Sequence, residues 1–286
     1  ALLRNGFDPY AVGPVVNPGI LLDNVSNVWT TTTTPYGPVH LLLADAIVRL
    51  TGENVIAGTM LLRITMLPGL ALMMWAVPHL ATKLGGNTSI ALWLAVLNPL
   101  VLIHLIGGVH NEMLMVGLMA AGIALALERK HLFGIGLIAL AVAIKATAGV
   151  ALPFIVWIWM IHEREDAAAA GREPASPIRS FVKTAGAGFA VFVAVLGSTS
   201  LIAGVGLGWT TALSGSAKII NWLSLPTIVA HIGTMATSWF AGDHFNDILE
   251  VSRTISAVVL IAIIAVVLST SIMLALIVWP FRKRGR

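Results

Sequence analysis

Long apolar runs, bounded by polar residues, Gly or Pro, make up most of this chain. A helix that crosses a membrane needs about 20 predominantly apolar residues. The runs that approach or exceed this length are 54–81, 90–106, 113–127, 132–161, 181–205 and 255–279. Residues 1–36 contain no such run. The pattern therefore predicts an all-α, polytopic transmembrane protein that is preceded by a polar stretch.

Composition supports this class and excludes several chemistries. Hydrophobic residues make up 57% of the chain and charged residues only 10%, whereas soluble domains have about 25% charged residues. The absence of Cys excludes disulfides, thiolate catalysis and iron–sulfur clusters. A phosphate-binding loop motif is missing, and His162-Glu163 is followed by Asp166 where a zinc protease motif requires His.

Loop charges predict the orientation, because short cytoplasmic loops collect Lys and Arg. One set of loops and the end of the chain carry these residues: Lys83, Arg129, Lys130, Arg164, Arg172, Arg179 and 281–286. We therefore expect residues 1–36 to form an outer loop, 37–280 a transmembrane domain, and 281–286 a basic cytoplasmic tail. Within the domain, 162–180 is a cytoplasmic loop and 206–250 an outer one, where 226–240 lies at the interface or re-enters. The net charge of +4 follows from this anchoring and does not indicate a nucleic-acid partner.

The run 132–161 conflicts with a single crossing, because both of its flanks are rich in Arg. Two short passes of about 14 residues each, which meet near 145–149, would place both flanks on the cytoplasmic side. Backbone that breaks at membrane depth is tolerated only where it is buried or lines a cavity. The prediction is thus about seven passes, including a short re-entrant-like pair. One long, tilted and kinked helix is the alternative.

Lys145 stands in an apolar stretch with no acidic residue within ten positions on either side. A Lys at the bilayer centre costs roughly 2.5–3.5 kcal/mol, so such a residue is a candidate for function. A phosphate group near the membrane surface would be a suitable partner. The alternative is a lysine that reaches the interface from the end of a helix.

The segment His110-Asn111-Glu112 follows two Gly residues and opens an apolar helix. Asn111 can cap that helix and Glu112 can complement its dipole, which would be a purely structural role. The same three groups would also suit sugar hydroxyls or proton transfer on the side of Lys145. Both interpretations remain open at this point.

One turn sequence within residues 1–36 carries Asp8 and Tyr10, and a second, at the end of this segment, carries Tyr36. Pro and Gly account for each turn without any chemistry. The Tyr rings could nonetheless stack on sugars, while Trp29 fits the interfacial aromatic belt better.

The order of these motifs resembles the polyprenyl-phosphate-mannose-dependent alpha-1,6-mannopyranosyltransferases of lipomannan and lipoarabinomannan synthesis. The resemblance runs from the first residues to about Thr227 and rests on the order of short segments, none of which is specific alone. These segments are Asn5-Gly-Phe-Asp8-Pro-Tyr10, Thr34-Pro-Tyr36-Gly-Pro38, Thr51-Gly-Glu-Asn54, Leu62-Arg63, Gly107-Gly-Val-His110-Asn111-Glu112, Ala143-Ile-Lys145-Ala-Thr147 and Trp222-Leu-Ser-Leu-Pro226-Thr227.

The resemblance implies the GT-C membrane glycosyltransferase architecture and inverting chemistry on the outer face of the plasma membrane. The donor would be polyprenyl-phosphate-mannose, and the acceptor a lipid-anchored mannan that is extended through alpha-1,6 linkages. No resident cofactor is implied, and participation of a divalent metal stays an alternative. The competing function is a lipid-linked saccharide transporter or flippase, which predicts inverted repeats and polar groups on both faces; this sequence shows neither.

By resemblance, Lys145 would hold the donor phosphate, and His110, Asn111, Tyr10, Tyr36 and Arg63 would contact substrate. Glu112 and Asp8 are the catalytic candidates in this chain. The family's base lies just upstream of the segment that matches 5–10. The chain as given is therefore expected not to transfer mannose by itself.

Overall fold

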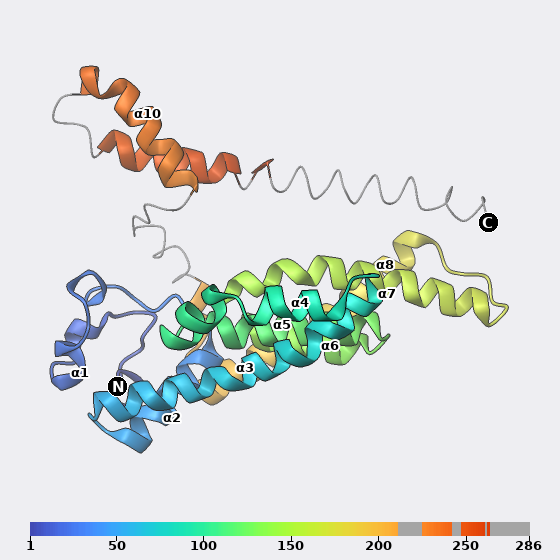
Figure 1. The fold of residues 1–286 in the computed structure, drawn as a ribbon, viewed down its shortest axis with the longest axis horizontal. Helices are drawn as coiled ribbons and strands as arrows, with labels where there is room; N and C mark the ends of the chain where they lie inside the picture. The colour runs from blue at the N-terminus through green and yellow to red at the C-terminus, as the bar shows by residue number, and fades with distance from the viewer. Residues whose placement is uncertain (211–224, 242–246, 261, 264–286) are drawn as a thin grey trace. The chain divides into compact units, whose positions relative to one another are not determined.

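The computed structural model describes residues 1–210, 225–241, 247–260 and 262–263, and these residues form helices and turns without a strand (Figure 1). The prediction of an all-α fold is confirmed. The chain divides into two compact units, Ala1–Ser216 and Ala217–Arg286. The second unit contains α10 (Leu225–Ala241) and a helical stretch over 247–260. The predicted tail 281–286 and most of the run 255–279 lie outside the described residues.

Residues 1–36, called the outer stretch after the side of the membrane expected for them, fold into short turns and 3-10 segments. They contain 3-10 turns at Leu3–Asn5, Pro14–Val16 and Asn27–Trp29, and the four-residue helix α1 at Ile20–Asp23. The helix α2 (Pro38–Thr51) follows, with Pro38 at its first position, where a missing N–H costs nothing.

Two helices of the bundle begin at asparagine caps. Asn54 accepts a hydrogen bond from Ala57 N at the start of α3 (Val55–Lys83), and Asn87 accepts one from Ile90 N at the start of α4 (Thr88–Val96). The run 90–106 is not one straight helix. It bends by 42° between α4 and a π-helical segment, Leu100–Gly107, because Pro99 cannot continue the backbone hydrogen bonds.

Glycine pairs bring the central helices α3, α5 (Glu112–Leu127) and α6 (His131–Val142) into close contact. A Cβ atom on Gly117 of α5 would lie 2.2 Å from the carbonyl oxygen of Gly69 in α3. A Cβ atom on Gly122 would lie 2.6 Å from the carbonyl oxygen of Gly134 in α6. Small residues are common where membrane helices approach this closely, since helices within a lipid bilayer associate mainly through van der Waals packing.

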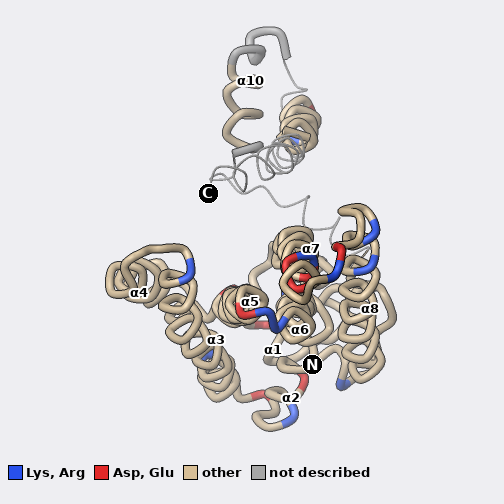
Figure 2. The backbone as a smooth tube through the Cα atoms, turned by 90° about the vertical axis from the view of Figure 1, so that its right-hand side faces the viewer, with Lys and Arg blue, Asp and Glu red and all other residues tan. Residues whose placement is uncertain are grey.

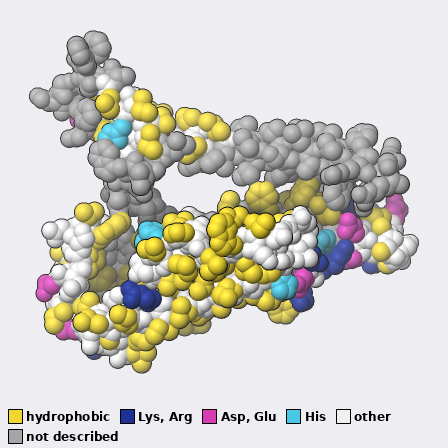
Figure 3. All heavy atoms as spheres, in the orientation of Figure 1, with side chains coloured by type: hydrophobic (Ala, Val, Ile, Leu, Met, Phe, Trp, Pro, Cys, Tyr) yellow, Lys and Arg dark blue, Asp and Glu magenta, His cyan; other side chains and the backbone are white. Residues whose placement is uncertain are grey.

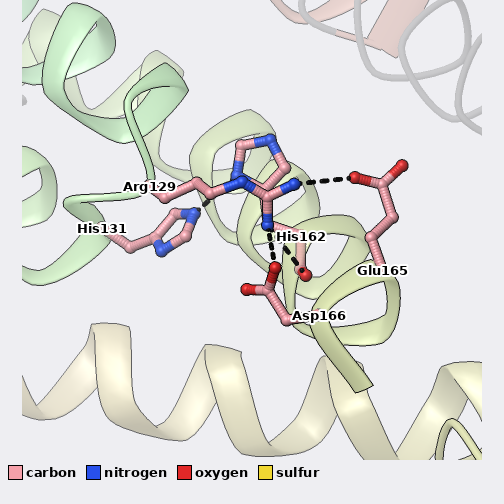
Figure 4. A network of polar contacts seen from close by, with 5 residues as sticks. All are labelled: Arg129, His131, His162, Glu165 and Asp166. Carbon is pink, nitrogen blue, oxygen red and sulfur yellow. Dashed lines mark hydrogen bonds and ion pairs between the residues drawn. The ribbon is translucent and has the colours of Figure 1, made fainter. Parts of the chain in front are cut away.

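The predicted break in 132–161 is confirmed. α6 ends at Val142, a 3-10 segment covers Ala146–Ala151, and α7 (Leu152–Ala169) returns antiparallel to α6. The start of α6 therefore lies beside the end of α7: His131 Nε2 is 2.8 Å from His162 Nδ1, and Arg129 forms ion pairs with Glu165 and Asp166 (Figure 4). The alternative of one long helix is wrong.

Among the described residues, three helical stretches are long and apolar enough to cross a membrane: α3, Ala146–Ala169, and α8 (Pro177–Ala203). The bent pair formed by α4 and Leu100–Gly107 passes the same test jointly, while α5 and α6 are shorter apolar helices. Hydrophobic side chains cover much of the face of the bundle in Figure 3. Charged residues instead gather near the labels of α5, α6 and α7 in the view of Figure 2, and those of α7 lie within the helix.

The hairpin geometry predicts that the α5–α6 and α7–α8 turns are on one side of the membrane. Because the chain has no Cys, single Cys residues at Lys130 and Arg172 can be labelled cleanly in intact cells. Both should react from the same side, and Ser26→Cys in the outer stretch should react from the other. Labelling of Lys130→Cys and Arg172→Cys from opposite sides would contradict the hairpin.

Candidate functional site

The candidate site is centred on an ion pair between Lys145 and Glu112. Lys145 lies three residues after the end of α6 and immediately before the 3-10 segment, and Glu112 is the first residue of α5. Their side chains are 29% and 28% exposed. The sequence around Lys145 suggested an unpaired cation, and this is corrected: the counter-charge comes from a residue 33 positions earlier in the chain. An ion pair in a partly buried site lowers the cost of both charges.

His110 joins the pair from the turn before α5. Its Nδ1 atom lies 3.6 Å from Glu112 Oε2, and its ring stacks on His104 with centroids 4.1 Å apart. The residue before it, Val109, has a φ angle of 56°. This left-handed conformation is unfavourable for a β-branched residue, and such strain is typical of functional sites.

Asn111 does not cap α5 with its side chain, so that prediction is wrong. Its backbone is already helical, and its side chain is 5% exposed and directed elsewhere: Nδ2 lies 3.3 Å from Nδ1 of His40. Asn111 Oδ1 is buried and has no hydrogen-bond partner among the described residues. The segment thus links α5 to α2.

His40 is the residue of this site that sequence analysis missed. It lies in the first turn of α2, which is not among the helices that could span a membrane, and its ring centroid is 4.5 Å from that of Tyr36. Burial lowers the pKa of His40 to about 4, so the ring is neutral at physiological pH. Nδ1 then accepts the Asn111 hydrogen bond and Nε2 carries the proton. A single His shortly after a Pro-Tyr-Gly-Pro turn was the only signal in the sequence.

The turn before α2 clamps the end of α6. Gly37 N donates to Ile144 O at 3.0 Å, and Val39 N donates to Ala143 O at 2.8 Å. These bonds satisfy carbonyl groups that the helix end leaves free. Next to them, the Tyr36 ring centroid is 5.7 Å from Lys145 Nζ, within the range of a cation–π contact.

Tyr10 and Asp8 support this turn from the outer stretch. Tyr10 is only 6% exposed, and its hydroxyl donates to Tyr36 O at 2.8 Å. Burial raises the pKa of its phenol. The exposed Asp8 accepts a hydrogen bond from Tyr10 N at 2.9 Å, which closes the predicted turn. Both residues therefore make their hydrogen bonds within the outer stretch and the turn before α2.

Arg63 lies on α3 and holds the turn that carries His110. Its Nη2 donates to Gly107 O at 3.0 Å. Trp29 is 45% exposed, which is compatible with the interfacial position expected for it. Among the described residues, no group of three His, Asp or Glu side chains is arranged to hold a metal ion.

A cavity of about 460 Å³ adjoins the ion-pair centre. Tyr36 and His40, which contact Lys145 and Asn111, are also part of its wall. The remaining wall is formed by α2 and by the outer stretch. The geometry therefore provides a charged centre with an open cavity next to it.

Comparison with known proteins gives consistent matches. A family model described as "Alpha-(1->6)-mannopyranosyltransferase, N-terminal domain" matches residues 1–161. Alpha-(1->6)-mannopyranosyltransferase A of Mycobacterium tuberculosis is 52% identical over all of this chain and 52% of its own length. Alpha-(1->6)-mannopyranosyltransferase A of Corynebacterium glutamicum is 43% identical over 91% of this chain and 54% of its own. The chain thus spans about half the length of these relatives, and no solved structure matches it.

The contact at Gly37 yields a test of how the site is held together. A Cβ atom on Gly37 would lie 2.3 Å from Ala143 O, a backbone atom that cannot easily move. Gly37→Ala should therefore destabilise the protein by about 1–3 kcal/mol. Gly136→Ala, in α6 with open space around it, should be neutral or stabilising. Equal thermal stabilities of the two variants in detergent would contradict the clamp.

Proposed function

The chain belongs to the alpha-(1->6)-mannopyranosyltransferase family, and from that premise we propose that it contributes the reaction centre of a membrane mannosyltransferase. The donor is polyprenyl-phosphate-mannose, and the acceptor is a lipid-anchored mannan that grows by alpha-1,6 linkages at the outer face of the plasma membrane. The observation that carries this proposal is the Lys145–Glu112 ion pair, with a cavity next to it whose wall includes Tyr36, the neighbour of Lys145. It combines a phosphate-binding cation with a proton-accepting carboxylate.

The positions of the two ends of α6 support the proposal that the ion pair faces the outer side of the membrane. The first residue of α6, His131, lies in the cluster with Arg129, Glu165 and Asp166, at a turn that carries Arg and Lys. The helix ends at Val142, and the chain continues from there to Lys145. Twelve helical residues separate the two ends by about 18 Å. Since basic turns favour the cytoplasmic side, Lys145 belongs toward the outer side.

Lys145 is the proposed partner of the donor phosphate. An ammonium group binds phosphate through charge-assisted hydrogen bonds, and these strengthen in a site of low polarity. When the phosphate enters, Lys145 shares its charge with the new anion and holds Glu112 less tightly. Donor binding would thereby prepare the carboxylate for the next step.

Glu112 is the proposed proton acceptor, in place of the upstream base that the family resemblance implies. The oxygen of an acceptor hydroxyl attacks the anomeric carbon of mannose, and the bond from that carbon to the phosphate oxygen breaks. Polyprenyl phosphate leaves with the bonding electrons, and the hydroxyl proton moves to Glu112. His110, 3.6 Å from Glu112 Oε2, would orient the carboxylate. Asp8 is less suitable, because it lies exposed in a turn and accepts a hydrogen bond from Tyr10 N.

Two variants, each of which removes one charge, separate these roles. Lys145→Gln should raise the KM for the donor by roughly 10- to 100-fold, since a charge-assisted phosphate contact is lost. Glu112→Gln should keep or tighten donor binding, because it frees Lys145, while turnover falls by about 10²- to 10⁴-fold. The measurement is mannosyl transfer in membranes, with the chain in its natural full-length context.

Lys130→Gln is the matched control, because Lys130 pairs with Glu128 in the α5–α6 turn, away from the candidate site. Lys130→Gln should leave both the donor KM and the turnover number unchanged. An unchanged donor KM in Lys145→Gln, or full turnover in Glu112→Gln, would contradict the corresponding role. Movement of the lipid-linked sugar across the membrane without glycosidic bond formation would favour a transporter instead.

A further inference from the structure

The residues that line the cavity of about 460 Å³ differ in chemical character from one side to the other. One side is a single face of α2, on which His40, Leu41, Ala44 and Asp45 recur with helical spacing. Much of the opposite side is aliphatic and comes from the outer stretch, including Leu2, Leu3, Leu21, Leu22 and Val25. The space is within the size range of small-ligand sites, which combine apolar walls with a few placed polar groups.

Asp45 is a carboxylate of the cavity wall with one oxygen that accepts no hydrogen bond among the described residues, although the amino group of Ala1, also in the wall, interacts with it electrostatically. The Asp45 side chain is 15% exposed, and Oδ2 accepts a hydrogen bond from Arg49 Nε at 2.6 Å. The other oxygen, Oδ1, is buried and has no hydrogen-bond partner among the described residues. A buried carboxylate oxygen without a donor is unfavourable, so a ligand that supplies a donor would be bound preferentially.

The other groups of the wall narrow the class of ligand. His40 uses Nδ1 for Asn111 and has an N–H left at Nε2, and Tyr36 offers an aromatic ring. A sugar ring presents hydroxyl donors at its edge and C–H groups on its faces, which suits a carboxylate next to aromatic and aliphatic side chains. A hydrocarbon chain would fill the apolar part but would leave Asp45 Oδ1 without a donor.

We propose that this cavity binds the terminal saccharide of the acceptor glycan and that Asp45 Oδ1 accepts a hydrogen bond from one of its hydroxyl groups. The inference rests on the proposed mannosyl transfer and adds a second compartment to the site. Tyr36 and His40 connect the cavity with the Lys145–Glu112 ion pair. Both line the cavity, Tyr36 is next to Lys145, and His40 is hydrogen-bonded to Asn111, the neighbour of Glu112. An acceptor in the cavity is thereby presented to the ion pair.

The test is a comparison of the two Michaelis constants in the natural full-length context, with a short alpha-1,6-linked mannose oligosaccharide as acceptor. Asp45→Asn should raise the acceptor KM by roughly 10-fold or more and leave the donor KM unchanged, because a hydrogen bond to a charged group is weakened. Arg49→Gln removes the ion pair but keeps the carboxylate, and Asp23→Asn removes an exposed acid that does not line the cavity. Both controls should behave like the wild type.

A second variant acts on volume alone. Ala44→Phe narrows the same cavity and should also raise the acceptor KM. If Asp45→Asn leaves the acceptor KM unchanged, or if Ala44→Phe raises only the donor KM, the acceptor assignment is overturned and a hydrocarbon occupant is favoured. Loss of acceptor affinity in Arg49→Gln equal to that in Asp45→Asn would also overturn it, since the ion pair alone would then explain the effect.

Direct binding separates this inference from the proposed function. If the wild-type protein transfers no mannose, saturation-transfer NMR with the same oligosaccharide still tests the cavity. Binding that is lost in Asp45→Asn and kept in Asp23→Asn would support the saccharide site, even though the proposed reaction had failed. An oligosaccharide that does not bind the wild-type protein, or that binds Asp45→Asn equally well, would overturn the saccharide site.

Discussion

A cation at the end of an apolar helix needs a counter-charge, and the Lys145–Glu112 pair meets this need. The pair joins the start of α5 to the break after α6, so it determines which other groups meet there. His110 and Asn111 arrive with Glu112, and Tyr36 arrives with the turn that binds the end of α6. The residues of the candidate site are thus brought together by the contact that neutralises the charge of Lys145.

The short length of α6 makes this arrangement available. At about 18 Å, α6 is shorter than a hydrocarbon core of about 30 Å, and the chain turns back after it as α7. The two ends of the hairpin are then held by different means. At one end Arg129 pairs with acidic residues of α7, and at the other the turn before α2 binds the carbonyls of Ala143 and Ile144. The glycine contacts of α5 with α3 and α6 keep the helices between these ends close.

Local patterns were sufficient to predict much of this arrangement. The Arg-rich flanks of 132–161 predicted the hairpin, and Lys145 was identified because nothing near it in the sequence could pair with it. The partner of Lys145, the true contact of Asn111 and the role of His40 depend on contacts 33 and 71 residues apart in the chain. Helix propensity suggested a cap for Asn111, but the buried His40 provided a tertiary contact that local reasoning does not include. Distant pairings of this kind leave no periodic signal.

The most direct test of the central claim is the coupling energy between Lys145 and Glu112, measured by a double-mutant cycle of Lys145→Gln and Glu112→Gln on thermal stability in lipid nanodiscs. Contacting charged residues typically couple by about 0.5–3 kcal/mol. The account predicts a coupling in this range without donor and a smaller one when polyprenyl-phosphate-mannose saturates the protein, because the phosphate then shares Lys145. Additive effects of the two substitutions without donor would contradict the ion pair, and a coupling that the donor leaves unchanged would contradict its role in binding phosphate.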